Sequence, residues 1–125
     1  MKLIVVVDDN ESLASSLALA LARLPGIEVA ITDHAAKALS LIAEKASTDS
    51  VAALITDYNL PYTNGLELIR QARAVEGCRT LPAILITADD SIRCAKGSML
   101  DTPNAILRKP FSMKEVRRVV EELLR

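Results

Sequence analysis

One stretch of the sequence, LITDYNLPYTNG from Leu54 to Gly65, decides the fold. It begins as an apolar run typical of a buried strand and then reaches a carboxylate at Asp57. A loop with a proline follows, and Asn64-Gly65 opens an amphipathic segment. We therefore expect Asp57 at the carboxyl end of a strand, which is the edge where open α/β sheets bind their ligands.

The composition is that of one globular domain over residues 1–125. Half of the residues are hydrophobic, enough to bury a core, and 15 basic against 16 acidic side chains leave a net charge of −1. Such a balance gives no global attraction for nucleic acid or an anionic membrane. We expect a cytoplasmic protein, because the sequence has no signal peptide and no apolar run of about 18 residues. Cys78 and Cys94 are expected to be reduced thiols.

The segments around the opening stretch alternate between strand and helix patterns. An unbroken apolar run predicts a strand at residues 3–7, and further short, mostly apolar segments predict strands at residues 27–31, 51–56, 81–87 and 105–108. Apolar residues at helical spacing predict helices at residues 11–24, 33–46 with Asp33 as the cap, 65–75, 89–100, and after a cap at Ser112. Five strand-then-helix units predict a doubly wound parallel sheet with helices on both faces.

Polar side chains stand at the ends of four predicted strands: Asp8 and Asp9, Asp57, Thr87, and Lys109. With the strand order 2-1-3-4-5, all of them would converge on one crevice. Three carboxylates there would repel one another by on the order of 4 kcal/mol per pair at ~4 Å. A cation bound by oxygen ligands, Mg2+ or alternatively Mn2+, would offset that repulsion. It would also recruit a phosphoryl group, whose other oxygens Lys109 and Thr87 could bind.

Taken alone, each of these residues has a simpler explanation. Asp9 or Asn10 could cap the first helix, and Asp57 could be a turn residue. Thr87 could cap the next helix, and Lys109 could be solvated. The argument for a site therefore depends on their predicted convergence.

The sequence resembles, over its whole length, the receiver domain of two-component response regulators. The resemblance rests on four motifs in order: Val7-Asp8-Asp9, Asp57 with Leu60-Pro61 and Asn64-Gly65, Thr87-Ala88, and Lys109-Pro110-Phe111. It implies a flavodoxin-like α/β fold with five parallel strands in the order 2-1-3-4-5 and five helices. It also implies a signalling domain rather than a classical enzyme, with intrinsic self-phosphorylation and self-dephosphorylation chemistry.

The resemblance implies a role for each acidic residue. Asp57 would accept a phosphoryl group from the phosphohistidine of a sensor histidine kinase or a phosphotransfer protein. Asp9, Asp57 and the backbone carbonyl of Asn59 would bind Mg2+, and Asp8 would reach the ion through water. Asn59 and Asp89 would border the phosphoryl pocket, although Asp89 is equally well explained as a helix cap.

The remaining motif residues would complete the switch. Lys109 would pair with the phosphoryl oxygens, and Thr87 would be drawn in to hydrogen-bond one of them. The family also has a cis peptide at Lys109-Pro110 and a core anchor at the position of Phe111. One departure is Ile106, which stands where the family often has a tyrosine or phenylalanine that swings inward on activation.

The expected partners are a kinase and an output protein or domain that the sequence does not identify. The resemblance allows a homodimer through the fourth and fifth predicted helices and the fifth strand. No direct nucleic-acid contact is expected, because Glu115, Glu121 and Glu122 are interspersed with Lys114, Arg117 and Arg118 on the last helix. No membrane contact is expected, because the net charge of −1 gives no global attraction.

Three other functions share this architecture. A flavodoxin is disfavoured because Asp8-Asp9-Asn10-Glu11 would repel a cofactor phosphate, and a dinucleotide-binding fold because no GxGxxG follows a strand. An Asp-nucleophile, Mg2+-dependent phosphatase of haloacid-dehalogenase-like type is the remaining alternative. Such phosphatases carry DxD at the nucleophile, whereas this chain has Asp57-Tyr58-Asn59.

Overall fold

The computed structural model describes residues 1–89, 91–92 and 102–125. Its main strands are β1 Lys2–Val7, β2 Ile27–Thr32, β3 Val51–Asp57, β6 Ala83–Thr87 and β7 Ala105–Arg108. The helices are α1 Glu11–Leu21, α2 Ala35–Ala46, α3 Gly65–Arg73 and α4 Met113–Leu123. Between β3 and α3, the short strands β4 Asn59–Leu60 and β5 Thr63–Asn64 pair as an antiparallel hairpin.

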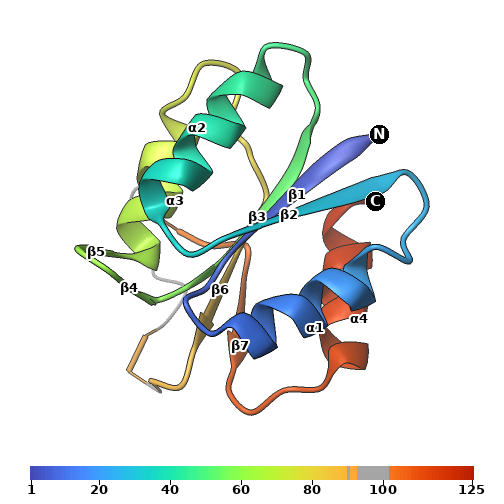
Figure 1. Cartoon of the computed structure of the whole chain (residues 1–125), viewed down its shortest axis with the longest axis vertical. Helices are drawn as coiled ribbons and strands as arrows, with labels where there is room; N and C mark the ends of the chain where they lie inside the picture. The colour runs from blue at the N-terminus through green and yellow to red at the C-terminus, as the bar shows by residue number, and fades with distance from the viewer. Residues whose placement is uncertain (90, 93–101) are drawn as a thin grey trace.

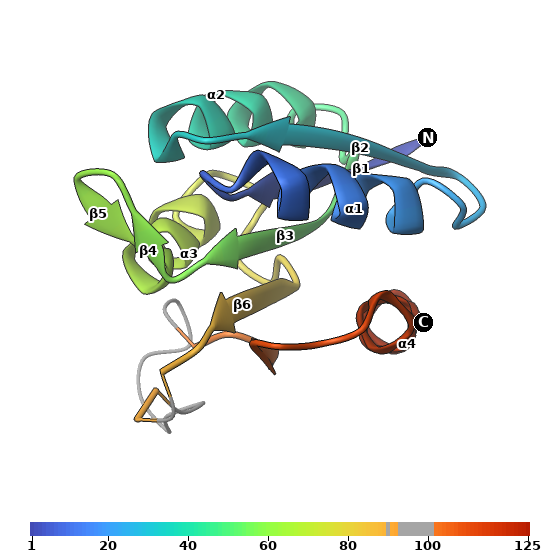
Figure 2. The same ribbon diagram turned by 60° about the horizontal axis from the view of Figure 1, so that its bottom comes forward.

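The five main strands form one parallel sheet in the order β2-β1-β3-β6-β7. This is the predicted 2-1-3-4-5 order, because β6 and β7 are the fourth and fifth strands of that sheet. Figures 1 and 2 show α2 and α3 over one face and α1 and α4 over the other. The doubly wound, flavodoxin-like fold is thus confirmed. Four of the five predicted helices are present in the part described, and most of the helix predicted at 89–100 falls outside it.

Strand β1 shows how the sheet supplies two hydrophobic cores at once. Leu3, Val5 and Val7 pack in the core layer beneath α2 and α3, whereas Ile4 and Val6 pack in the layer beneath α1 and α4. All five are at most 5% exposed. Successive side chains of a strand point to opposite faces, so an unbroken apolar run is what a sheet covered on both faces requires.

Side chains cap three of the helices. Asn10, Asn64 and Ser112 each accept a hydrogen bond from the backbone N–H three residues later, which satisfies one of the unpaired donors of the first turn. The predicted Ser112 cap is therefore confirmed, but the predicted Asp33 cap is wrong. His34 occupies that position, and the Asp33 carboxylate instead lies 2.7 Å from Nδ1 of the His34 ring.

Two helices end earlier than the hydrophobic pattern predicts. Helix α1 ends at Leu21, yet Leu24 remains buried because it packs in the core layer beneath α1 and α4, and its N–H bonds to the Leu21 carbonyl in a turn. Helix α3 likewise ends at Arg73, not at residue 75. The pattern reports burial, and burial continues past the last helical hydrogen bond. The β4–β5 hairpin was not predicted, and its tip places Tyr62 fully in solvent at a φ of 67°.

Cys78 is a free thiol buried in the core layer beneath α2 and α3, and this burial raises its pKa. That agrees with the prediction of a reduced cysteine, whereas Cys94 lies outside the described residues. Every helix in the described parts of the chain is too short or too polar to cross a membrane.

Candidate functional site

Three carboxylates meet at the carboxyl ends of β1 and β3. Asp8 and Asp9 directly follow β1, and Asp57 is the last residue of β3. One carboxylate oxygen from each residue lies within 4.8 Å of the others. Asp8 and Asp57 are buried, at 3% and 5% exposure, whereas Asp9 is exposed to solvent. The structure therefore brings these three predicted residues together at one edge of the sheet.

Asp8 is the carboxylate with the least satisfied surroundings. Its Oδ1 accepts a hydrogen bond from the Asn10 N–H at 2.8 Å, but its buried Oδ2 has no partner among the described residues. Burial raises the pKa of Asp8; the Asn10 N–H and the Lys109 charge oppose this, while the charges of Asp57 and Asp9 add to it. A buried anion with one unpaired oxygen is stabilised by a cation bound beside it.

Asn10 settles which residue caps the first helix. Its Oδ1 accepts the N–H of Leu13 at 3.1 Å, so Asp9 is not the cap. The Asp9 side chain is instead one of the three that meet at the strand ends.

A lysine follows the last strand and faces the carboxylates. The Nζ atom of Lys109 lies 3.5 Å from Oδ2 of Asp57, and the Lys109-Pro110 peptide is cis, as the resemblance implies. Phe111 packs against the core layer beneath α1 and α4 but is only half-buried, so it is less of a core anchor than expected. One ammonium thus balances one of the three carboxylates.

Thr87 ends β6, beside the end of β3, and is 2% exposed. Its Oγ1 accepts a hydrogen bond from the backbone N–H of Asp89 at 3.0 Å. The hydroxyl proton is therefore still available for donation to another group. This bond makes a local turn, whereas most of the next helix, which Thr87 could cap by its simpler explanation, lies outside the described residues.

The segment after Thr87 is held by two further side chains. Oδ1 of Asp89 accepts hydrogen bonds from the N–H and the hydroxyl of Ser91, which lower the pKa of Asp89. The Arg108 guanidinium donates to the carbonyl oxygens of Asp89 and Ile92. Sequence reasoning missed Arg108. Its signal was its place at the end of the fifth strand, directly before Lys109.

Gly65 allows the hairpin and α3 to lie against the strand that carries Asp57. A Cβ atom on Gly65 would lie 2.5 Å from the backbone carbonyl oxygen of Asp57 and 2.6 Å from Cδ1 of Leu85. The Gly65 N–H also donates to the carbonyl of Tyr58 at 2.8 Å. The Asn64-Gly65 motif thus combines a helix cap with a position where only glycine fits.

Two further residues singled out from the sequence lie outside the carboxylate cluster. Asn59 begins β4, two positions after Asp57, and its side chain is exposed. Ile106 is half-buried and packs against the core layer beneath α2 and α3.

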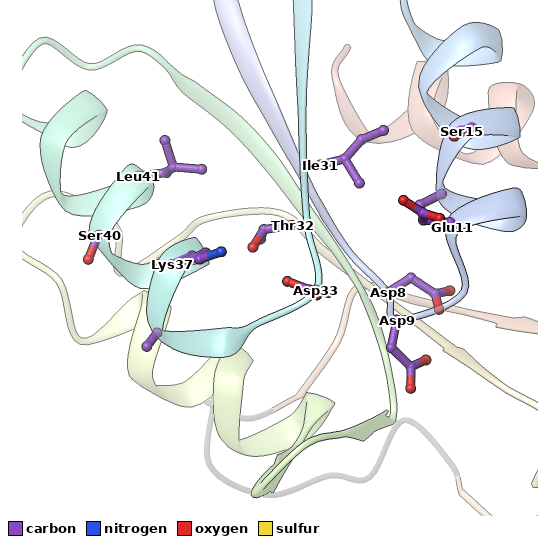
Figure 3. Close-up of a pocket in the computed structure, with 12 residues that line it drawn as sticks. Asp8, Asp9, Glu11, Ser15, Ile31, Thr32, Asp33, Lys37, Ser40 and Leu41 are labelled. Atoms are coloured by element: carbon purple, nitrogen blue, oxygen red, sulfur yellow. The ribbon is translucent and has the colours of Figure 1, made fainter.

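A cleft of about 1090 Å3 reaches Asp8 and Asp9, two of the three carboxylates, from the side of the edge strand β2 (Figure 3). Asp8 and Asp9 line one part of it, and Lys37 on α2 lines another. The cleft lies between α1 and α2, whose Ser15 and Ser40 contribute hydroxyl groups to its walls. Water and small hydrated ions can therefore reach the cluster.

The donor atoms at this edge suit a hard divalent cation. Asp8, Asp9 and Asp57 offer carboxylate oxygens alone, and among the described residues no cysteine or histidine joins the cluster. Three carboxylates beside one ammonium leave an excess of negative charge that a divalent ion would neutralise. Oxygen ligands of this kind fit Mg2+ or Mn2+ rather than zinc.

The fold and the site together define a doubly wound α/β protein with an acidic pocket at its strand ends. Residues 4–121 match the model of the response regulator receiver domain, and the chain belongs to this family. It is therefore a receiver domain of two-component signalling and not a classical enzyme, and the haloacid-dehalogenase-like alternative is not favoured.

Individual relatives agree with this assignment. A chemotaxis protein CheY homolog from Campylobacter jejuni is 30% identical over 124 residues, which cover 99% of this chain and 92% of that protein. The fold is similar to that of chemotaxis protein CheY4 from Vibrio cholerae, with a TM-score of 0.82, 22% identity and 99% coverage of both chains. It is also similar to the receiver domain of a sensor histidine kinase from Pseudomonas aeruginosa, solved with a magnesium ion coordinated in its active site cleft. In that comparison the TM-score is 0.76 and the identity 24%, with 98% and 97% of the two chains covered.

Proposed function

We propose that this receiver domain, taken as the whole of residues 1–125, accepts a phosphoryl group on Asp57. The donor would be the phosphohistidine of a sensor histidine kinase or of a phosphotransfer protein. The observation that carries the proposal is the placement of the Asp57 carboxylate between two other carboxylates and the Lys109 ammonium, 3.5 Å away. A carboxylate, a cation site and a fixed ammonium are the groups that phosphoryl transfer to an acid requires.

The proposed transfer is a substitution at phosphorus. An oxygen of the Asp57 carboxylate forms a bond to phosphorus while the phosphorus–nitrogen bond of phosphohistidine breaks. The imidazole leaves with a proton from solvent, and an acyl phosphate remains on Asp57. A carboxylate nucleophile carries no proton that a base must remove, so the site needs charge stabilisation rather than a general base.

Asp8, Asp9, Asp57 and the backbone carbonyl of Asn59 would hold Mg2+, with Mn2+ as an alternative. When bound, the ion would neutralise negative charge on the carboxylates and on the phosphoryl oxygens. The unpaired Oδ2 of Asp8 and the all-oxygen donor set support this assignment. So does the magnesium ion in the active site cleft of the Pseudomonas aeruginosa receiver domain.

Lys109 and Thr87 would stabilise the product. The Lys109 ammonium already faces Asp57 and would pair with a phosphoryl oxygen. The Thr87 hydroxyl, whose proton is available, would donate to another oxygen. The resulting movement around Thr87 would change the surface offered to an output protein, to an output domain or to a second copy of the chain.

The proposal is tested by labelling with acetyl phosphate and Mg2+, followed by intact-mass and peptide mass spectrometry. We expect one phosphoryl group on Asp57, lost on treatment with hydroxylamine, because acyl phosphates are cleaved by this nucleophile. Asp57→Asn should remain unlabelled. The control Asp33→Asn, which changes an exposed carboxylate near the same sheet edge, should label as the wild type does. Labelling of Asp57→Asn, or an unlabelled wild type, would refute the proposal.

A further inference from the structure

Arg108 is a charged side chain next to the site that the phosphoryl chemistry does not use. In the parallel pairing of β6 with β7, it lies directly opposite Thr87. Its guanidinium reaches past the end of β6 and donates to the carbonyl oxygens of Asp89, at 2.6 Å, and of Ile92. A guanidinium presents several N–H donors in one rigid plane, so a single side chain can hold two carbonyls at once.

Asp89 links Arg108 to the Thr87 hydroxyl by hydrogen bonds. Arg108 holds the carbonyl of Asp89, and the N–H of Asp89 donates to Oγ1 of Thr87 at 3.0 Å. The Asp89 carboxylate then accepts both donors of Ser91. A movement that takes Oγ1 of Thr87 away from the Asp89 N–H would therefore break a hydrogen bond of a residue that Arg108 holds.

We propose that Arg108 is a positioning residue that stabilises this arrangement of Thr87, Asp89, Ser91 and Ile92 against one in which Thr87 binds a phosphoryl oxygen. The inference rests on the proposed function of Asp57. A group that interacts with only one of two conformations shifts their populations by its differential interaction energy. Arg108 therefore opposes phosphoryl binding, and its removal makes phosphoryl binding tighter.

A purely electrostatic role predicts the opposite sign. If Arg108 acted through its positive charge, it would attract an anionic ligand, and its removal would weaken binding. Replacing it with lysine would then have little effect, because the charge remains. In the positioning role, lysine is a poor substitute, because its single ammonium does not reproduce the planar fork that spans two carbonyls.

The test measures the affinity of the full chain for beryllium trifluoride with Mg2+, a stable analogue of the acyl phosphate. We expect Arg108→Met to bind it about five- to tenfold more tightly than the wild type, within the range of typical coupling energies. Arg108→Lys should fall between the two. The control Arg118→Met, which removes an exposed arginine on α4 paired with Glu122, should match the wild type. Equal or weaker binding by Arg108→Met would overturn the proposal.

A second measurement needs neither metal nor analogue. By NMR hydrogen exchange, protection of the Asp89 and Ser91 amides should fall about tenfold in Arg108→Met and stay unchanged in Arg118→Met, because local opening governs such exchange. Unchanged protection in Arg108→Met would overturn the proposal even if the analogue binds. If the wild type fails to bind the analogue, the proposed function of Asp57 fails, and the exchange result still decides whether Arg108 holds this segment. Thermal unfolding confirms that each variant is folded.

Discussion

Two arginines hold the backbone at opposite ends of β6 and β7, in different surroundings. Arg73 on α3 is 6% exposed and donates to two backbone carbonyls and to Oδ1 of Asn104, at the amino end of these strands. Arg108 is only half-buried and donates to two carbonyls at the carboxyl end. Water can replace a lost hydrogen bond only where it has access. The guanidinium hydrogen bonds of Arg73 should therefore stay formed in the folded protein, whereas those of Arg108 can break and form again.

The largest expected loss of stability follows from removing the hydrogen bonds of the buried Arg73. Arg73→Met removes a buried guanidinium whose described hydrogen bonds include a fully buried one to the Leu81 carbonyl and part-buried ones to Thr102 and Asn104, so the free energy of unfolding should fall by about 3 kcal/mol. Urea denaturation followed by circular dichroism would measure the loss.

Two matched variants calibrate this result. Arg70→Met removes an exposed arginine on the same helix, paired with Glu67, and should cost below about 1 kcal/mol. Arg108→Met should also cost below about 1 kcal/mol, because water can reach the carbonyls that it leaves. If Arg73→Met and Arg108→Met lost the same free energy of unfolding, the proposed difference between the two sets of hydrogen bonds would be wrong.

A substitution at Gly65 tests how tightly the residues beside Asp57 are packed at the carboxyl end of β3. In Gly65→Ala the new Cβ would overlap the Asp57 carbonyl oxygen, so we expect a loss of about 2 kcal/mol from forced backbone displacement. Gly77→Ala is the comparison, because nothing lies within 4 Å of its Cβ and only its φ of 86° opposes alanine. It should lose about 1 kcal/mol. A smaller loss at Gly65 than at Gly77 would mean that the hairpin yields easily.

Substitution of Asp8 should have the opposite effect on stability. Folding raises the pKa of Asp8, so its ionised form destabilises the native state, and stability falls as the pH rises through that raised pKa. Without divalent metal at pH 7, Asp8→Asn should therefore raise the free energy of unfolding by about 1 kcal/mol. This advantage should vanish as the pH falls through the pKa of Asp8.

Melting temperatures with and without Mg2+ would test the same variant further. The wild type should gain stability from Mg2+, because a ligand that binds only the native state stabilises it, and Asp8→Asn should gain less. Asp33→Asn, an exposed carboxylate, should respond to Mg2+ as the wild type does. An Asp8→Asn variant that melts lower than the wild type without metal would show that the crowded carboxylates do not oppose folding.

The sequence predicted most of the fold because each strand is marked by a local run of apolar residues. A sheet covered on both faces needs unbroken apolar runs, and the predicted strand at residues 105–108 coincides with β7. The Ser112 cap was equally local. The errors came from local competition: Asp33 is a good cap by type, but its carboxylate bonds to the neighbouring imidazole of His34.

The sequence predicted those features of the site that follow from the sheet topology. Parallel strands end at a common edge, so the clustering of Asp8, Asp9 and Asp57 followed from their positions after two strands. Their unequal exposure did not follow, because burial depends on how the loops pack. The reach of Arg108 was also hidden, since it depends on the path that the chain takes after β6.

Two tyrosines, Tyr58 directly before the hairpin and Tyr62 at its tip, allow the unmodified chain to report on its own site by fluorescence. There is no tryptophan, so Tyr58 and Tyr62 account for its intrinsic fluorescence. Tyr58 follows Asp57 and packs partly against the core, whereas Tyr62 stands fully in solvent. Emission from Tyr58 should respond to a charge added to its neighbour, while Tyr62 supplies a constant background. Substituting Tyr62 would leave a single native fluorophore one residue from the carboxylate of interest.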